Sequence, residues 1–226
     1  MRPLLAALSF FVPISAQAVD PDVSREVAAV RAELARSHAE LLKYIWREQT
    51  DVLVGGKLKS STDARCGYGS NGDIIRQSLG PEEEKPGSKQ TSNRPLVRSK
   101  GDMQDYIERS ISRIREYAPP NPAVIDRLVN SGQASLGPSS GGTSEVRMTE
   151  YFVPGDSVVF TYDSVSKRLL HVAVSSNIGP KDPITLEAIF DLLPGSVNHL
   201  ASAVLKAPSR KVQVNVRNLD YKKLAE

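Results

Sequence analysis

The chain has 226 residues, of which 40% are hydrophobic and 24% are charged. This balance fits one globular domain and excludes a disordered or fibrous chain. The formal net charge is +3 and the basic residues are scattered along the sequence, which excludes the clustered positive charge typical of a nucleic-acid-binding protein.

The N-terminus has the pattern of a secretory signal peptide. A positive charge at Arg2 precedes an apolar run from Leu4 to Ile14, and a small-x-small site follows at Ala16–Ala18. This pattern predicts that residues 1–18 are the signal peptide. The run is too short to span a bilayer, and no later segment approaches the ~18 apolar residues of a membrane-spanning helix. We therefore expect a periplasmic or secreted protein without a transmembrane segment in its mature chain.

The mature chain begins with a helix and a hairpin. Apolar residues recur every three or four positions from Ser24 to Leu42, which predicts an amphipathic helix. The period then changes to two, and Gly55–Gly56 offers the positive φ angles of a tight turn. We expect paired strands at Tyr44–Val54 and Lys57–Tyr68.

Cys66, in the second of these strands, is the only cysteine of the chain. An exported form therefore cannot make an internal disulfide, and its fold must be held by the core alone. A reactive cysteine needs a nearby base and a positive environment, whereas the flanking ARCGYGSNG indicates a strand that runs into a turn. We interpret Cys66 as a structural residue.

The middle of the chain combines long polar stretches with two more helices. Residues 78–100 are rich in proline, glycine, serine and charge, which predicts a flexible insertion. A second amphipathic helix is expected at Met103–Tyr117, and a third opens at the capping residue Asn121 and ends near Gly132. The composition of Ser135–Ser144 predicts a flexible loop, and its serines lack the G-x-S-x-G pattern of a hydrolase.

The sequence after Ser144 alternates between apolar and polar residues. In one run Leu170, Val172 and Val174 share the apolar face, and four or five such strands follow one another through short turns. This predicts an antiparallel meander with one apolar and one polar face. We expect an α+β fold over residues 19–226, in which a curved sheet of six or seven strands packs on two or three helices.

Three blocks of sequence carry a resemblance to known proteins: LLKYIWREQTDVLVGGK, VPGDSVVFTYDSVSKRLLHVAVSS and SRKVQVNVRNLDYKKL. Their order resembles that of an uncharacterised family of exported bacterial proteins. More distantly, the layout resembles the half-barrel superfamily of periplasmic lipoprotein carriers (LolA-like) and envelope-stress sensors. This resemblance implies a half-barrel sheet whose hollow holds acyl chains, with a lipid or a lipoprotein acyl chain as the partner.

Catalytic and metal-binding patterns do not emerge from the sequence. His38, His171 and His199 are far apart and lack metal-ligand spacing, and we interpret His38 and His171 as surface residues. We predict no catalytic residue, no metal and no cofactor. Aromatic residues dominate both cores and binding sites. Six side chains are therefore the candidates to contact a ligand in the hollow: Tyr44, Trp46, Arg47, Phe160, Val172 and Phe190.

Three hypotheses about function remain at this stage. The first is a non-catalytic envelope protein that shelters an apolar ligand between sheet and helices. The second is a protein-interaction or scaffold domain of the envelope, with a filled core and other envelope proteins as partners. The third, a hydrolase with dispersed residues, ranks last because no motif supports it. An unfilled apolar hollow distinguishes the first hypothesis from the second.

Overall fold

The computed structural model describes residues 20–80, 96–179 and 182–224. The predicted signal peptide, residues 1–18, lies outside these ranges. In chain order the elements are α1 (Pro21–Leu41), β1 (Tyr44–Val54), β2 (Lys57–Tyr68), β3 (Ile74–Ser78), α2 (Leu96–Tyr117), α3 (Pro122–Asn130), β4 (Ala134–Ser140), β5 (Thr143–Thr149), β6 (Ser157–Asp163), β7 (Leu169–Gly179), β8 (Asp182–Leu193), β9 (Val197–Ala207), a 3-10 turn (Pro208–Arg210) and β10 (Val212–Lys223).

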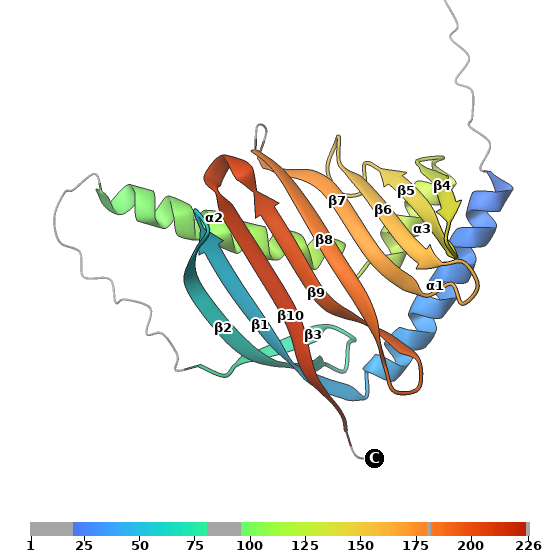
Figure 1. The fold of residues 1–226 in the computed structure, drawn as a ribbon, viewed down its shortest axis with the longest axis horizontal. Coiled ribbons are helices and arrows are strands. Elements are labelled where there is room, and N and C mark those ends of the chain that lie inside the picture. The colour runs from blue at the N-terminus through green and yellow to red at the C-terminus, as the bar shows by residue number, and fades with distance from the viewer. Residues whose placement is uncertain (1–19, 81–95, 180–181, 225–226) are drawn as a thin grey trace, which may run out of the picture.

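All ten described strands form one antiparallel sheet in the order β3-β2-β1-β10-β9-β8-β7-β6-β5-β4. The sheet is open and curved, and the three helices lie on one of its faces (Figure 1). The pairing of β1 with β10 joins the first and last strands of the chain in the interior of the sheet, which leaves β3 and β4 as its edges. Within the described residues no helix is long and apolar enough to cross a membrane.

The predicted α+β class is confirmed, but the expected count of six or seven strands is too low. The predicted loop Ser135–Ser144 belongs instead to the hairpin of β4 and β5, which turns at Gly141 and Gly142 with φ angles of 58° and 81°. β3 is the other strand that the alternation of apolar and polar residues in the sequence did not predict. Both missed strands lie at sheet edges where most side chains face water, so neither has a continuous apolar face.

The helix starts also differ from the sequence-based expectation. α1 begins at Pro21 instead of Ser24 because the Asp20 carboxylate caps it, accepting a hydrogen bond from the Asp22 amide at 2.9 Å. α2 begins at Leu96, inside the predicted insertion 78–100, of which residues 81–95 lie outside the described ranges. The expected cap of α3 is confirmed by hydrogen bonds from two backbone amides to the Asn121 side chain.

The core lies between the helices and the sheet, with most of its buried strand residues on β5 to β8 and further ones on β9, β10 and β1. α1 buries Val23, Val27 and Val30 against the β5 to β8 part of the sheet. In β7 the structure buries Leu169 rather than Leu170, because the pairing with β6 shifts by one residue between Thr161 and Tyr162. The space left beneath α1 amounts to about 20 Å³, so this part of the fold is filled. We call it the filled half.

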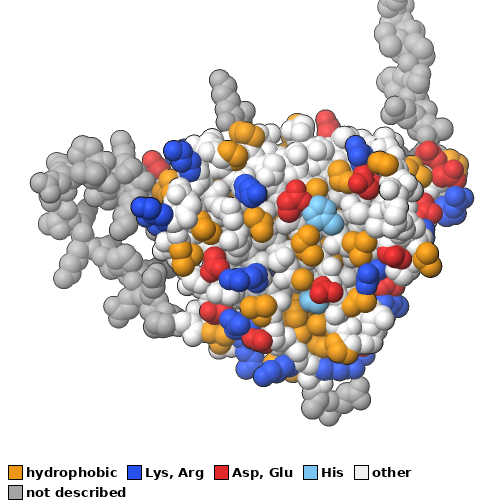
Figure 2. All heavy atoms as spheres, viewed as in Figure 1, with side chains coloured by type: hydrophobic (Ala, Val, Ile, Leu, Met, Phe, Trp, Pro, Cys, Tyr) orange, Lys and Arg blue, Asp and Glu red, His pale blue; other side chains and the backbone are white. Residues whose placement is uncertain are grey.

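The opposite face of the sheet carries interleaved charges and isolated apolar side chains (Figure 2). Arg47 bridges neighbouring strands through Asp63 at 2.8 Å and Asp220 at 2.9 Å. These cross-strand pairs are exposed, as expected for the polar face of an antiparallel sheet.

Candidate ligand-binding cavity

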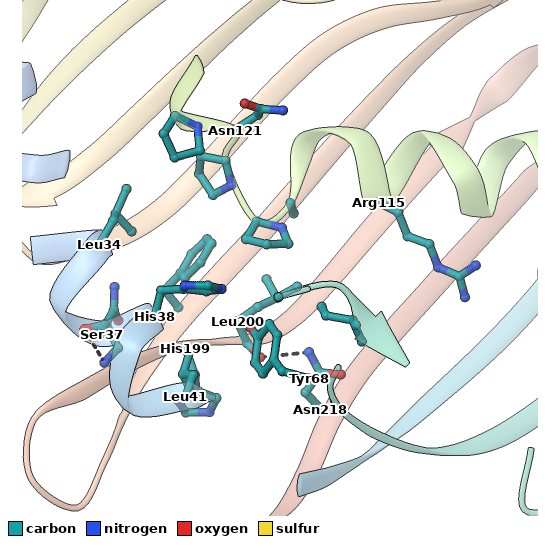
Figure 3. A pocket seen from close by; sticks show the side chains of 18 of the residues that line it. Leu34, Ser37, His38, Leu41, Tyr68, Arg115, Asn121, His199, Leu200 and Asn218 are labelled. Carbon is teal, nitrogen blue, oxygen red and sulfur yellow. Dashed lines mark hydrogen bonds between the residues drawn. The ribbon is translucent and has the colours of Figure 1, made fainter. Parts of the chain in front are cut away.

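A cavity of about 840 Å³ opens where β1, β2, β9 and β10 pass beneath the C-terminal half of α1 and the joint between α2 and α3. Its size falls within the range of roughly 300–1,000 Å³ found for small-molecule sites. In Figure 3, Leu34, His38 and Leu41 extend from α1 toward side chains of the sheet, and Arg115 extends from α2. We call this region of the molecule the open end.

One wall of the cavity is apolar. It is built by side chains of α1 and α3, by the joint Ala118–Asn121, by the turn before β6, and by one residue each of β3 and β8. Its apolar side chains are Leu34, Leu41, Ile74, Ala118, Pro119, Pro120, Ile125, Phe152 and Phe190. A hydrocarbon chain is the natural occupant of such a wall, because burial of apolar surface stabilises the bound state.

An aromatic cluster from β1, β2, β9 and β10 forms the floor of the cavity. The Trp46 ring stacks on Tyr221, with ring centroids 5.5 Å apart and planes at 15°, and it lies 5.4 Å from Tyr68. His199 meets Tyr221 edge-on at 4.5 Å, and His38 from α1 meets Tyr68 at 5.1 Å. These contacts bring together residues that are distant in the sequence.

Glu48 is a buried carboxylate on the same floor. Its oxygens accept hydrogen bonds from Arg76 Nε at 2.9 Å and from Arg115 Nη2 at 3.4 Å. The contacts tie β1 to β3 and to α2 across the cavity, since each guanidinium comes from a different element. Burial raises the pKa of the neighbouring Cys66 thiol to about 11, and the negative charge of Glu48 adds to this shift. This agrees with a structural role for the thiol.

The polar part of the floor continues onto β9 and β10. Asn218 Nδ2 donates to the Leu200 carbonyl at 3.0 Å, and the Tyr221 hydroxyl donates to the same oxygen at 3.3 Å. Asn198 Nδ2 donates to the Leu169 carbonyl at 2.9 Å. Burial lowers the pKa of His199, which favours the neutral imidazole.

The buried carboxylate of Asp156 fixes the joint above the cavity. It accepts hydrogen bonds from the Tyr117 hydroxyl at the end of α2 and from the backbone amides of Tyr151 and Phe152. The Tyr151 hydroxyl accepts from the Asn121 amide at 3.0 Å. Because these bonds connect the joint to the turn that carries Phe152, one network positions two parts of the apolar wall.

The structure brings together only some of the side chains predicted to contact a ligand. Trp46 and Phe190 line the cavity. Tyr44 lies beside it, with its ring 6.5 Å from that of Tyr221. Two of the other three, Phe160 and Val172, belong to the packed core.

Arg47, the last candidate, alternates with Trp46 along β1 and lies on the opposite face of the sheet. There its guanidinium pairs with two carboxylates and does not line the cavity.

Several cavity residues were missed by the sequence-based reasoning. His38, interpreted as a surface residue, is exposed but also lines the cavity. Glu48 and Asn218 sit at inward positions of strands whose other inward residues are apolar or aromatic, apart from Thr50 on β1. A polar residue at an inward position was the available signal, because such a residue is costly in a packed core. Among the described residues no cluster of three or more metal-ligating side chains occurs.

Comparisons with known proteins give similarities in fold. No protein-family profile matches the chain, and no curated protein matches its sequence. A LolA superfamily protein from Nitrosomonas europaea is 10% identical, with a TM-score of 0.47 over 87% of this chain and 94% of that one. A DUF1329 family protein from Desulfovibrio piger is 9% identical, with a TM-score of 0.46 over 89% of this chain and 92% of that one.

A third solved structure, described as an outer membrane lipoprotein-sorting protein domain from Vibrio parahaemolyticus, superimposes with a TM-score of 0.50 at 9% identity. It covers 89% of this chain and 93% of the other. At this identity the likeness concerns the fold alone. The chain thus resembles this lipoprotein-sorting domain in its overall fold.

Proposed function

We propose that the protein is a non-catalytic binding protein of the cell envelope, which shelters the apolar chain of an amphiphilic ligand such as a lipid in the cavity at the open end. The observation that carries the proposal is the 840 Å³ cavity and the apolar side chains that line it. The location in the periplasm or outside the cell rests on the predicted signal peptide. The fold likeness to lipoprotein-sorting domains is compatible with this role.

The energetics of this cavity favour a chain of moderate length. Each methylene group that moves from water into an apolar site contributes ~0.8 kcal/mol. A chain of about a dozen carbons therefore has enough apolar surface to offset its loss of freedom on binding. A ligand present at 100 times its dissociation constant would stabilise the folded state by about 2.7 kcal/mol.

The scaffold hypothesis is supported by a different observation, on the edge strand β3. Ile75 on that strand is 60% exposed, and Leu79 just beyond its end is 54% exposed. An unpaired edge with apolar side chains is a known docking surface for an extended segment of another protein. This hypothesis predicts a protein partner and does not require a ligand in the cavity.

Trp46 provides a direct test, because it is the only tryptophan of the chain and it lines the cavity. Titration of the mature protein with laurate below its micelle concentration should change the Trp46 emission and raise the melting temperature. Native mass spectrometry of protein purified without detergent should show a co-purifying lipid. Absence of all three signals would refute the ligand hypothesis and favour the scaffold.

A matched pair of substitutions on α1 localises the binding. Ala35 lines the cavity, whereas Ala39 is an exposed alanine of the same helix that does not. Ala35→Phe should obstruct the cavity and weaken laurate binding about tenfold, while Ala39→Phe should leave it unchanged. Equal affinities for both variants would place the binding elsewhere on the molecule.

A further inference from the structure

Several residues that line the cavity carry buried polar atoms without a hydrogen-bond partner in the protein. Seven buried side-chain nitrogen or oxygen atoms of the described residues lack a partner, and five of them belong to cavity residues: Arg31 Nε, Trp46 Nε1, Asn198 Oδ1, His199 Nδ1 and Asn218 Oδ1. Buried polar groups are nearly always hydrogen-bonded, so each exception calls for an explanation, such as a bound water or ion or a functional role. Four of these five residues lie on β1, β9 and β10, and we call them the polar subsite (Trp46, Asn198, His199, Asn218).

The chemistry of these atoms defines the groups that they can recognise. Both asparagine amides donate through Nδ2 to backbone carbonyls, which leaves Oδ1 of each as an acceptor. His199 is hydrogen-bonded to the Asp191 backbone through its other ring nitrogen, so the neutral ring offers Nδ1 as a third acceptor. Trp46 Nε1 is a donor. Three acceptors and one donor suit a ligand that carries several hydroxyl groups.

The charges around the cavity do not favour an ionic head group. Three arginines, Arg31, Arg76 and Arg115, and three acids, Glu48, Asp73 and Glu116, line it, so the formal charges cancel (three minus three). Both Arg76 and Arg115 are paired with Glu48, and Arg31 is paired with Asp126. A charged head group would have to compete with these pairs, whereas an uncharged one would leave them intact.

The aromatic cluster supplies the second element of recognition. Tyr68 and Tyr221 are half-buried on the cavity floor, on either side of Trp46. A sugar ring presents C–H groups on its faces and hydroxyl groups around its rim. Aromatic rings can contact the C–H groups while neighbouring acceptors bind the hydroxyls.

We infer that the cavity binds an amphiphile with an uncharged, sugar-like head group, whose hydroxyls occupy the polar subsite while its chain follows the apolar wall. The inference rests on the proposed function, because it assigns the head group of the same ligand. The same hydroxyl chemistry would also be offered by a free sugar, and the test separates the two sources.

The test compares probes that share a twelve-carbon chain and differ in the head group. Dodecyl maltoside, laurate and dodecylphosphocholine are titrated into the mature protein below their micelle concentrations, and maltose serves as the free sugar. Calorimetry should show dodecyl maltoside binding at least tenfold tighter than the anionic laurate and the zwitterionic dodecylphosphocholine, with maltose much weaker. If maltose binds as tightly as dodecyl maltoside, the polar subsite binds a free sugar, and the inference that the ligand is an amphiphile is wrong.

Variants of the subsite provide the decisive control. Asn218→Leu and His199→Phe should each weaken dodecyl maltoside about tenfold and leave laurate unchanged, whereas Asn215→Leu, on the outward side of the same strand, should affect neither. Unchanged laurate binding also shows that the variants are folded. Equal affinities for all three amphiphiles, or equal losses for laurate and dodecyl maltoside, would overturn the head-group assignment while leaving the proposed function in place. Binding of none of the amphiphiles would overturn both.

Discussion

The filled half and the open end belong to the same sheet but bury different kinds of side chain. In the filled half the inward positions of β6, β7 and β8 are apolar throughout most of their length, as with Phe160, Val172 and Leu186. At the open end the inward positions of β1 and β10 include Glu48 and Asn218. The strand period is the same in both, so the period alone does not distinguish the core from the cavity.

The difference also depends on how the helices cover the sheet. α1 lays its valines directly on the filled half and leaves about 20 Å³ there. The open end is covered by the C-terminal half of α1 together with the joint Ala118–Asn121, which Asp156 and Tyr151 hold in place. A short irregular segment cannot fill the space that a helix face would fill. We therefore attribute the cavity to the arrangement of the helices over the floor.

Two phenylalanines on neighbouring regions of the sheet test this contrast most strongly. Phe160 is enclosed in the filled half, whereas Phe190 borders the cavity. Phe160→Ala should lower the free energy of unfolding by ~3–5 kcal/mol because it creates a new cavity. Phe190→Ala enlarges a space that exists already and should cost about 2 kcal/mol. Denaturant unfolding measures both, and equal costs would contradict the division into filled and open regions.

Removal of the buried carboxylate at the open end should have the next largest effect on the free energy of unfolding. Glu48→Gln should destabilise the protein by about 2 kcal/mol, because Arg76 and Arg115 lose their charged partner in a partly buried setting. Quenching of Trp46 fluorescence by acrylamide should also increase, since the link from α2 to the floor is weakened. A destabilised variant with unchanged quenching would show that Glu48 does not hold the cavity closed.

The sequence predicted the parts of the fold that follow from local chemistry. The first hairpin was predicted with its observed bounds because Gly55 and Gly56 permit a turn with positive φ at both positions. The stop of α2 at Tyr117 follows from the two prolines after it. The edge strand β4 could not be recognised, because neither of its faces is continuously apolar.

The site was predictable only in part. Trp46 and Phe190 were among the candidates because an aromatic residue at an inward position is compatible with either a core or a ligand site. His199, Asn218 and Tyr221 were not, since their proximity arises from the pairing of β10 with β9 and β1. Alternation assigns a residue to a face of the sheet, but the position of the cavity on that face depends on the helices above it.

Three buried tyrosines predict a loss of stability at alkaline pH. Burial raises the pKa of Tyr106, Tyr151 and Tyr162 to about 12 each, above the ordinary value of about 10. The folded state thus holds these protons more tightly than the unfolded state. Their contribution is fully present below pH ~10 and is lost as the pH rises toward 12.

Tyr162→Phe isolates one of these groups. Its hydroxyl donates to Glu26 on α1 at 3.1 Å, so the variant should lose about 1 kcal/mol at pH 7. It should also show a shallower decline of stability between pH 9 and pH 11.5, measured by denaturant midpoints across that range. An unchanged decline would mean that Tyr162 ionises equally easily in both states.

The smallest effect is expected on the outer face of the sheet, where ion pairs are exposed and belong to neither region of the interior. Asp51 accepts a hydrogen bond from Arg217 Nη2 at 2.8 Å and another from the Ser61 hydroxyl at 2.6 Å. The Arg217 side chain is 50% exposed, so water and salt screen the pair. Asp51→Asn should therefore cost less than ~1 kcal/mol, and the cost should shrink further at 0.5 M salt. Glu48→Gln, measured under the same conditions, should keep most of its cost because Glu48 is only 7% exposed and its nearer partner Arg76 is 25% exposed. If the two substitutions cost the same, or respond to salt alike, the electrostatic distinction between the cavity floor and the outer face would be wrong.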